Sequence, residues 1–398
     1  MNWRGRSATP PAASTDARSA PTGGAPGPSA PESGAVSAAE ERYFVASQWQ
    51  LMWRKFRRHR MALAGGGVLL FLYLTTAVAG FLSPYEKATR DAAYLLAPPQ
   101  RVRLFHDGRL LGPFVYSLER TRDPETLQRI YTEHTGDPHR IRFFVRTDRY
   151  KFLGFIRTDL HLFGVHPPAT LYLFGTDELG RDMFSRVLYA GRVSLSVGLL
   201  GVAISFLLGV VIGGISGYVG GAVDTVIQRI IEFLISIPTL PLWMGLTAAL
   251  PPKWPALRVY FGITIILSIL GWTGLARVVR GKLLELRSGD FVVAARVSGA
   301  TSGAVIRRHL LPSFLSYLIV HLTLAVPNMI LGETALSFIG LGLKPPVVSW
   351  GVLLTTAQNF RTVALSPWLM IPVLFVVVTV MTFMFLGDGL RDAADPYK

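Results

Sequence analysis

The sequence predicts an all-helical protein that crosses a membrane six times. Half of its 398 residues are hydrophobic, only 16% are charged, and the mean hydropathy is +0.39, which is too apolar for an ordinary soluble enzyme. A membrane-spanning helix needs about 20 mostly apolar residues to cross about 30 Å of hydrocarbon. Runs of this kind lie at residues 61–82, 193–217, 230–250, 259–279, 314–338 and 368–387.

The basic residues predict the orientation of the chain. The formal net charge is +15, but Lys and Arg lie at the ends of the apolar runs and form no stripe, so we expect no nucleic-acid partner. Five basic residues at 54–60 precede the first run, and the positive-inside rule places the amino terminus in the cytoplasm. The connection 280–312 then lies on the same side. It holds six Lys and Arg residues, whereas the outer connection 339–367 holds two.

Two segments precede the first span, which is predicted at residues 61–82. Residues 1–41 are rich in Pro, Ala, Ser, Thr and Gly, so they bury too little apolar surface to offset the entropy of ordering. We expect them to form a disordered cytoplasmic tail. Residues 42–60 combine aromatic and basic side chains, which predicts an amphipathic helix at the membrane surface, in contact with lipid.

A long segment, residues 84–185, is too polar to cross a membrane, and in this orientation it is external. Within it, residues 101–111 alternate in polarity around an Asp-Gly pair at 107–108, which is a strong signal for a β-hairpin. We therefore expect a small external insertion that contains strands. It is followed by a transmembrane core at 186–389 and a cytoplasmic tail at 390–398.

The connection 280–312 is the longest of those that face the cytoplasm within the core, and it predicts two short helices. Asp290 is a favourable N-cap for the first helix, and Gly299 is a favourable C-terminal stop. Thr301 or Ser302 can cap a second helix that Pro312 ends. The result is a helix–turn–helix element that projects from the membrane between two spans.

This element has the features of a docking surface. Two adjacent alanines keep one face of its first helix flat, which permits close approach by another protein. The spacing of Ala294, Ala295, Gly299, Leu311 and Pro312 resembles that of the EAA loop, by which permeases of bacterial ABC importers dock into their ATPase subunits. Val293 stands where that loop often has Glu, and His309 where it often has Ile.

A second motif precedes the span at 193–217. Residues 174–186 resemble the sequence found at this place in dipeptide and oligopeptide importer permeases of the C type. Further motifs follow in the order of that family, at 217–224, 236–238, 336–351 and 387–396. The motif residues before the span are Gly175, Thr176, Asp177, Gly180, Arg181, Asp182, Ser185 and Arg186.

The resemblance implies a fold, a function and a set of partners. The fold is that of a type I ABC importer permease, and the function is ATP-driven, binding-protein-dependent import through a bacterial inner membrane, with peptides as the expected cargo. The partners are a second, homologous permease, two ATPase subunits and an external substrate-binding protein. Related permeases also serve nickel, glutathione, opines, oligosaccharides and peptide antibiotics, so other cargoes remain open.

The chain lacks the sequence features of an ATPase or of another enzyme. A phosphate-binding loop needs Gly-x-x-x-x-Gly-Lys-[Ser/Thr], but the pair Gly281-Lys282 has Ala276 at the upstream glycine position and is followed by Leu283. Cysteine is absent, which excludes thiolate metal sites and cysteine nucleophiles. We therefore predict a transport subunit without catalytic residues, metal or cofactor, and ATP hydrolysis by its partners.

An ion-coupled secondary transporter is the alternative from another mechanistic class. It would need ionisable groups well inside the bilayer. Glu232 and Glu333 lie near the ends of predicted spans, and His321 lies about a third of the way into one. Each is either an ion-coupling group or a polar contact between helices or at the interface.

Overall fold

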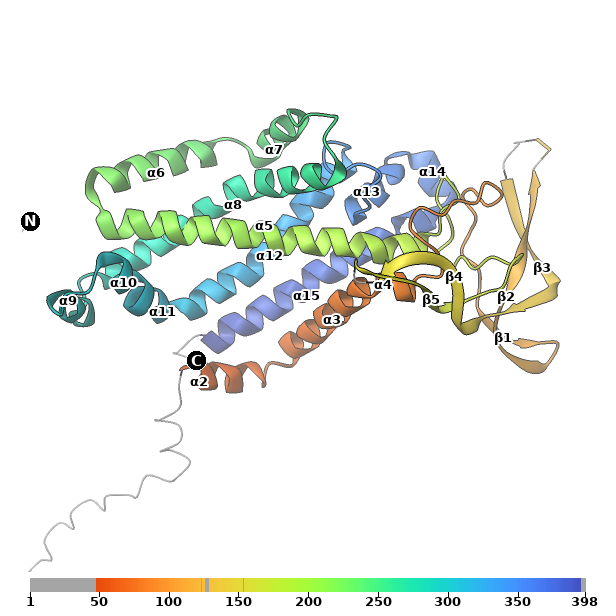
Figure 1. Cartoon of the computed structure of the whole chain (residues 1–398), viewed down its shortest axis with the longest axis horizontal. Helices are drawn as coiled ribbons and strands as arrows, with labels where there is room; N and C mark the ends of the chain where they lie inside the picture. The colour runs from red at the N-terminus through yellow and green to blue at the C-terminus, as the bar shows by residue number, and fades with distance from the viewer. Residues whose placement is uncertain (1–47, 123, 126–128, 153, 395–398) are drawn as a thin grey trace, which may run out of the picture. The chain divides into compact units, whose positions relative to one another are not determined.

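The computed structural model describes residues 48–122, 124–125, 129–152 and 154–394 (Figure 1). The tail predicted at residues 1–41 lies outside this part of the chain. So do the first residues of the predicted amphipathic segment and the last four residues of the sequence.

Long helices dominate the described residues. Five helical segments are long and apolar enough to cross a membrane, and a bent pair of helices passes the same test together. The bent pair is α6 (Gly221–Ser236) and α7 (Thr239–Ala248). The long helices are α3 (Arg60–Ala77), α5 (Met183–Val219), α8 (Ala256–Leu286), α12 (Leu315–Phe338) and α15 (Ile371–Ala394), the last preceded by the short turn η3 (Pro367–Met370).

The span predicted as one helix at residues 230–250 is broken in the structure. α6 and α7 meet at an angle of 88°. The break lies at Ile237 and Pro238, which both have extended backbone with ψ of 128°. Proline has no N–H to donate to the preceding turn, and it disfavours helical geometry in the residue before it. The prediction of a single helix here is therefore wrong.

The bent pair nevertheless supplies the sixth candidate span. α5 and α8 lie side by side and run in the same direction, as two hydrogen bonds show. The Tyr260 hydroxyl donates to Ser196 Oγ (2.9 Å), and further along both helices Ser268 Oγ donates to the Gly201 carbonyl (3.0 Å). Since the two helices are parallel, the chain between them must return along the bundle, and α6 with α7 makes that pass (Figure 1). With the bent pair counted as one span, the described residues hold up to six candidate spans, the number that the sequence predicts.

Small residues bring α5 and α8 into close contact. They recur every four residues on the face of α5 that meets α8, at Ser205, Gly209, Gly213 and Gly217. A Cβ atom on Gly213 would lie 2.4 Å from the carbonyl oxygen of Ala276, and one on Gly217 would lie 2.7 Å from that of Arg280. Small residues at this spacing allow helix backbones to approach each other closely in a membrane.

The remaining long helices pack against this pair. α12 runs antiparallel to α5, and α15 contacts both α12 and α3. α15 is longer than predicted, because the helix continues past residue 387 to Ala394. Helix α2 (Gln48–Phe56) lies at the start of α3, where Phe56 packs with Ala62 and Ala393.

The segment between α3 and α5 forms a strand module. β1 (Arg103–His106), β2 (Arg109–Arg122) and β3 (Arg129–Arg140) make an antiparallel sheet, and β4 (Arg142–Phe152) pairs with β5 (Ile156–Gly164). The hairpin predicted at residues 107–108 is confirmed, because Asp107 and Gly108 have φ of 49° and 77°, as a type I′ turn requires. The module lies at one end of the bundle, the module end, and residues 290–313 lie at the other, the loop end (Figure 1).

The helix packing predicts the effect of one substitution. Gly213→Val should lower the melting temperature of the protein in detergent, because the new side chain would overlap the backbone of Ala276. Gly274→Val is the matched control: it lies on α8, where an added Cβ meets nothing within 4 Å. Equal melting temperatures for the two variants would contradict the close contact of α5 and α8.

Candidate functional site

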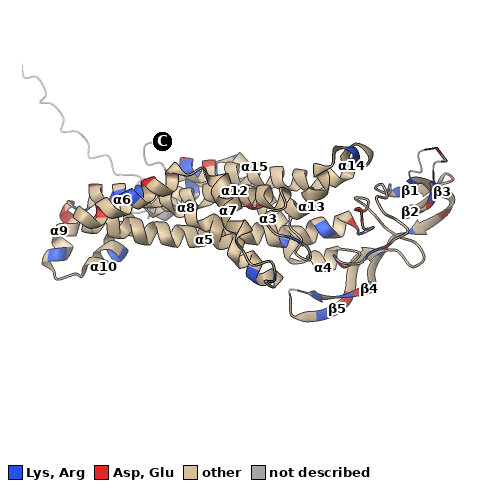
Figure 2. Ribbon diagram, turned by 90° about the horizontal axis from the view of Figure 1, so that it is seen from above, with Lys and Arg blue, Asp and Glu red and all other residues tan. Residues whose placement is uncertain are grey.

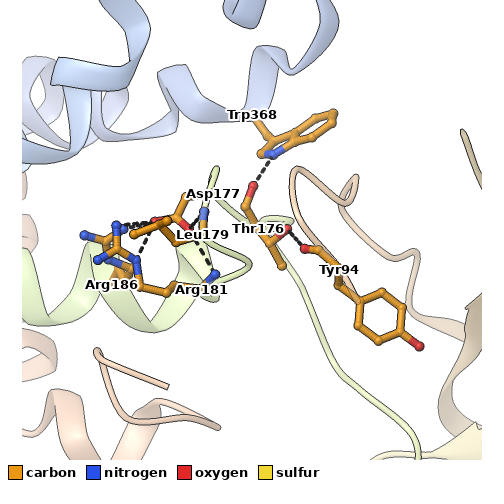
Figure 3. Close-up of polar contacts among 7 residues, drawn as sticks. All are labelled: Tyr94, Thr176, Asp177, Leu179, Arg181, Arg186 and Trp368. Atoms are coloured by element: carbon orange, nitrogen blue, oxygen red, sulfur yellow. Dashed lines mark hydrogen bonds and ion pairs between the residues drawn. The ribbon is translucent and has the colours of Figure 1, made fainter. Parts of the chain in front are cut away.

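The motif before the second span folds into one buried polar cluster at the start of α5 (Figure 3). Asp182 is the N-cap of α5, and its Oδ2 accepts hydrogen bonds from the backbone N–H and the hydroxyl of Ser185 (2.8 and 2.6 Å). Burial raises the pKa of the Asp182 carboxyl to about 6. Its other oxygen, Oδ1, has no hydrogen-bond partner in the described part of the chain.

Asp177 holds two arginines in this cluster. Its Oδ1 accepts from the backbone N–H groups of Leu179 and Arg181 (2.9 and 3.0 Å). Its Oδ2 accepts from Arg181 Nε (2.8 Å) and from Arg186 Nη1. The Arg186 residue is only 4% exposed, so its charge depends on the Asp177 carboxylate for compensation.

Thr176 connects the cluster to two other segments. Its hydroxyl donates to the carbonyl of Tyr94 (2.5 Å) and accepts from the N–H of Ala97 (2.8 Å). The indole of Trp368, in η3, donates to the Thr176 carbonyl (2.9 Å). The motif therefore joins the chain before the strand module, the start of α5 and the turn before α15.

Two glycines of the motif allow the chain to pass close to itself. Gly175 and Gly180 have φ of 71° and 70°, and a Cβ on Gly180 would lie 1.9 Å from the carbonyl oxygen of Asp91. Side chains at these positions would be strained in the backbone and would also collide with neighbouring atoms. The structure thus brings together all of the predicted motif residues from 175 to 186.

A second buried cluster at the module end surrounds Glu333. Its Oε1 accepts hydrogen bonds from Ser337 and Ser349 (both 2.7 Å), and its Oε2 accepts one from Ser194 (3.2 Å). Ser194 also accepts from the backbone N–H of Trp350, at the start of α13 (Trp350–Leu354). Glu333 therefore joins α5, α12 and α13, which favours the structural interpretation over an ion-coupling role.

The other candidates for ion coupling also have local contacts. Glu232 is exposed and forms an ion pair with Arg229 one turn earlier on α6 (2.8 Å). His321 is half-buried and stacks on the ring of Tyr317. These arrangements favour interhelix and surface contacts over a proton or sodium pathway.

At the loop end, residues 290–313 form the two short helices that the sequence predicted. The first is α9 (Asp290–Val297), and Gly299 beyond it has φ of 83°, which confirms its role as a left-handed stop. The prediction of Asp290 as N-cap is wrong: Gly289 is the N-cap, and Asp290 is the first helical residue. Gly289 has the extended backbone of an N-cap and no side chain, so the first turn of α9 receives no side-chain hydrogen bond.

The second helix begins as expected and ends one residue later than predicted. Thr301 is the N-cap of α10 (Ser302–Val305), which continues through a π turn at Ile306–Leu310 into α11 (Leu311–Ser313). The wider π turn accommodates Pro312, which lacks an N–H. The helical run ends at Ser313, because the backbone of Phe314, with φ of −124°, is no longer helical.

The loop has a buried side and an exposed side. Val292, Val305 and Leu310 are buried against α8 and the start of α12. On the exposed side, Val297 is 84% and Val293 is 48% exposed. Of the predicted docking residues, Asp290, Ala294, Gly299 and Pro312 are not buried, whereas Ala295 and Leu311 pack partly against the loop's own core.

An ion pair fixes the base of the loop, and the sequence alone did not reveal it. The Arg280 guanidinium donates two hydrogen bonds to the Asp224 carboxylate (2.5 Å each), and the Ser216 hydroxyl donates a third (2.5 Å). α5, α6 and α8 are therefore tied together at the loop end. Asp224 belongs to a predicted motif, but its partner lies 56 residues away.

Comparison with known proteins gives the family. A family model described as a binding-protein-dependent transport system inner membrane component matches residues 209–397, and the N-terminal TM domain of oligopeptide transport permease C matches residues 47–99. The dipeptide transport system permease protein DppC of Bacillus subtilis is 32% identical over 352 residues, which cover 88% of this chain and 86% of DppC. The chain belongs to the dipeptide and oligopeptide ABC permeases of the C type.

A second relative agrees with this assignment. The oligopeptide permease OppC of Escherichia coli is 40% identical to this permease over 231 residues, covering 56% of this chain and 72% of OppC. A solved structure of the inward-facing methionine transporter MetNI covers 53% of this chain and 97% of its own, with 19% identity and a TM-score of 0.41. Residues 100–208, with the strand module and the start of α5, lie outside both family matches.

The Asp177 cluster predicts a large loss of stability on removal of one charge. Asp177→Asn should reduce the free energy of unfolding in detergent by about 3–5 kcal/mol, because it leaves the buried Arg186 charge uncompensated. Glu232→Gln is the control, since its exposed ion pair with Arg229 contributes about 0–1 kcal/mol. A loss below about 1 kcal/mol for Asp177→Asn would mean that the cluster is not needed for stability.

Proposed function

We propose that this permease forms half of the translocation pathway of an ATP-driven, binding-protein-dependent importer of peptides. It lies in a bacterial inner membrane with its amino terminus and loop end in the cytoplasm. The names of two similar relatives, a dipeptide and an oligopeptide permease, support peptides as the cargo. The exposed apolar face of α9 carries the proposal that the permease is driven by a separate ATPase.

The α9 surface has the properties of a docking site. Val293, Ala294 and Val297 lie on its exposed side, next to the exposed Gly299. The opposite side of the same short element is buried against α8 and α12, so a force applied to α9 reaches two long helices directly. An apolar surface held on a packed base favours a protein partner over solvent.

ATP hydrolysis is assigned to partner subunits. The Gly281-Lys282 pair lies inside α8, where the backbone N–H groups are used within the helix and cannot cradle phosphates. We assign this task to two ATPase subunits, one of which docks on α9. An external substrate-binding protein delivers the cargo at the module end.

The pathway is assigned to the interface with a second, homologous permease. The space between α5, α8 and α12 is filled by buried hydrophobic side chains, among them Leu195, Leu267 and Ile330. A solute therefore has no open route through the middle of this bundle. A heterodimer of two related permeases can enclose a pathway that one of them does not.

The proposed orientation predicts which positions an impermeant maleimide labels. Because the chain contains no cysteine, single cysteines can be introduced at Leu110 in the strand module and at Ser302 in the loop, and both positions are exposed. Leu110→Cys should be labelled in intact cells, after permeabilisation of any outer membrane. Ser302→Cys should be labelled only after the inner membrane is opened, and the reverse pattern would contradict the orientation.

The docking proposal predicts a specific effect of Val297→Glu. Val297 is 84% exposed, so the substitution should leave folding and membrane abundance unchanged. It should abolish co-purification of the ATPase and ATP-dependent uptake, because it places an unpaired charge in the apolar interface.

Phe360→Glu is the matched control for this experiment. Phe360 is 86% exposed on α14 (Phe360–Leu365), in the connection between α12 and α15 at the module end. This variant should keep its ATPase partner. If Val297→Glu keeps full ATPase association and uptake, residues 290–313 are only a connector and the proposed coupling is wrong.

A further inference from the structure

A cleft with a volume of about 1460 Å³ lies between the strand module and the helices at the module end. One wall is formed by residues 86–90 and by β4 and β5. The other is formed by the first turns of α5 and α8 and by residues 345–348. Much of this cleft is therefore built from the segment at 100–208, outside both family matches.

The cleft carries a strong excess of positive charge. Eight Lys and Arg residues line it, against two acidic residues, Glu86 and Asp159. Two of the eight, Arg181 and Arg186, form ion pairs with Asp177, which does not line the cleft. The five exposed cations of the cleft have no acidic partner among the described residues; they are Lys87, Arg90, Arg149, Lys151 and Arg157.

Two of these cations lie directly opposite each other. Lys151 on β4 pairs with Arg157 on β5 in the antiparallel ladder, and Figure 2 shows basic residues on both strands. Like charges that face each other across two strands destabilise the pair. An anion between them would convert this repulsion into two favourable contacts.

Two residues that line the cleft carry hydrogen-bond donors that are not used. Arg186 Nε and the Tyr189 hydroxyl are buried and have no hydrogen-bond partner in the described part of the protein. Both residues line the cleft. A buried donor without a partner costs free energy that a bound acceptor can recover.

We propose that this cleft binds the carboxylate groups of an anionic solute. Guanidinium groups match the geometry of carboxylates, and basic walls raise the local concentration of anions. The volume exceeds the range of about 300–1000 Å³ that is usual for small-molecule sites, so an extended peptide segment fits as well as a small acid. If the proposed import function holds, the carboxylates come from an acidic peptide cargo; otherwise they come from a free organic acid.

Calorimetry on the purified full-length permease in neutral detergent tests this inference. The probes are triglutamate, its neutral analogue triglutamine, and citrate. At low ionic strength, triglutamate should bind at least about tenfold more tightly than triglutamine, because only the former supplies charge-assisted hydrogen bonds. Binding should weaken at about 0.15 M salt, where exposed charges are screened beyond about 8 Å.

A double variant locates the site. Lys151→Gln with Arg157→Gln should weaken triglutamate binding at least about tenfold. It should not lower the melting temperature of the protein, because it removes two opposed like charges. The matched control is Arg122→Gln with Arg129→Gln, which also removes two directly opposed cations, from β2 and β3 outside the cleft, and which should leave binding unchanged.

The outcomes distinguish a free acid from an acidic peptide as the source of the carboxylate. They also test the binding inference separately from the import proposal. Citrate binding as tight as that of triglutamate assigns the site to free acids, whereas much weaker citrate binding assigns it to acidic peptides. Equal binding of triglutamate and triglutamine, or equal losses in the two double variants, would overturn the inference. The assay needs neither ATPase nor binding protein, so its failure leaves the import proposal intact, and a failure of ATP-driven import leaves the binding result intact.

Discussion

The close contact of α5 and α8 is the constraint on which the other elements depend. Glycines on α5 remove the side chains that would hold the two backbones apart, and the helices then lie parallel. The parallel arrangement requires α6 and α7 to return the chain along the bundle. It also places the ends of both helices together at the loop end, where Arg280 of α8 binds Asp224 of α6.

In the proposed importer, this helix pair links the two ends of the permease. α5 has 37 residues, a length of about 55 Å at 1.5 Å per residue, and it runs without interruption from the Asp177 cluster to the loop end. There the guanidinium of Arg296, on α9, lies over the ring of Tyr218, with 5.0 Å between its carbon and the ring centroid. A displacement of α9 by an ATPase would therefore act on a helix that begins at the polar cluster of the module end.

Patterns within a short window predicted much of the fold, and contacts between distant residues account for what they missed. Hydropathy located the spans, the Asp-Gly pair located a hairpin, and Gly299 located a turn. Hydropathy did not register the break at Pro238, because proline inside an apolar run hardly changes its mean. The motif residues at 175–186 were found by resemblance, but Gly180 is required by Asp91, which no local pattern connects to it.

The most direct test of the account is uptake by proteoliposomes that contain this permease, its homologous partner and two ATPase subunits. A labelled peptide and the binding protein are supplied outside, and ATP is supplied inside. The account predicts uptake that requires both ATP and the binding protein and that ion gradients do not replace. Uptake by this permease in the absence of ATP, driven by a proton or sodium gradient, would contradict it.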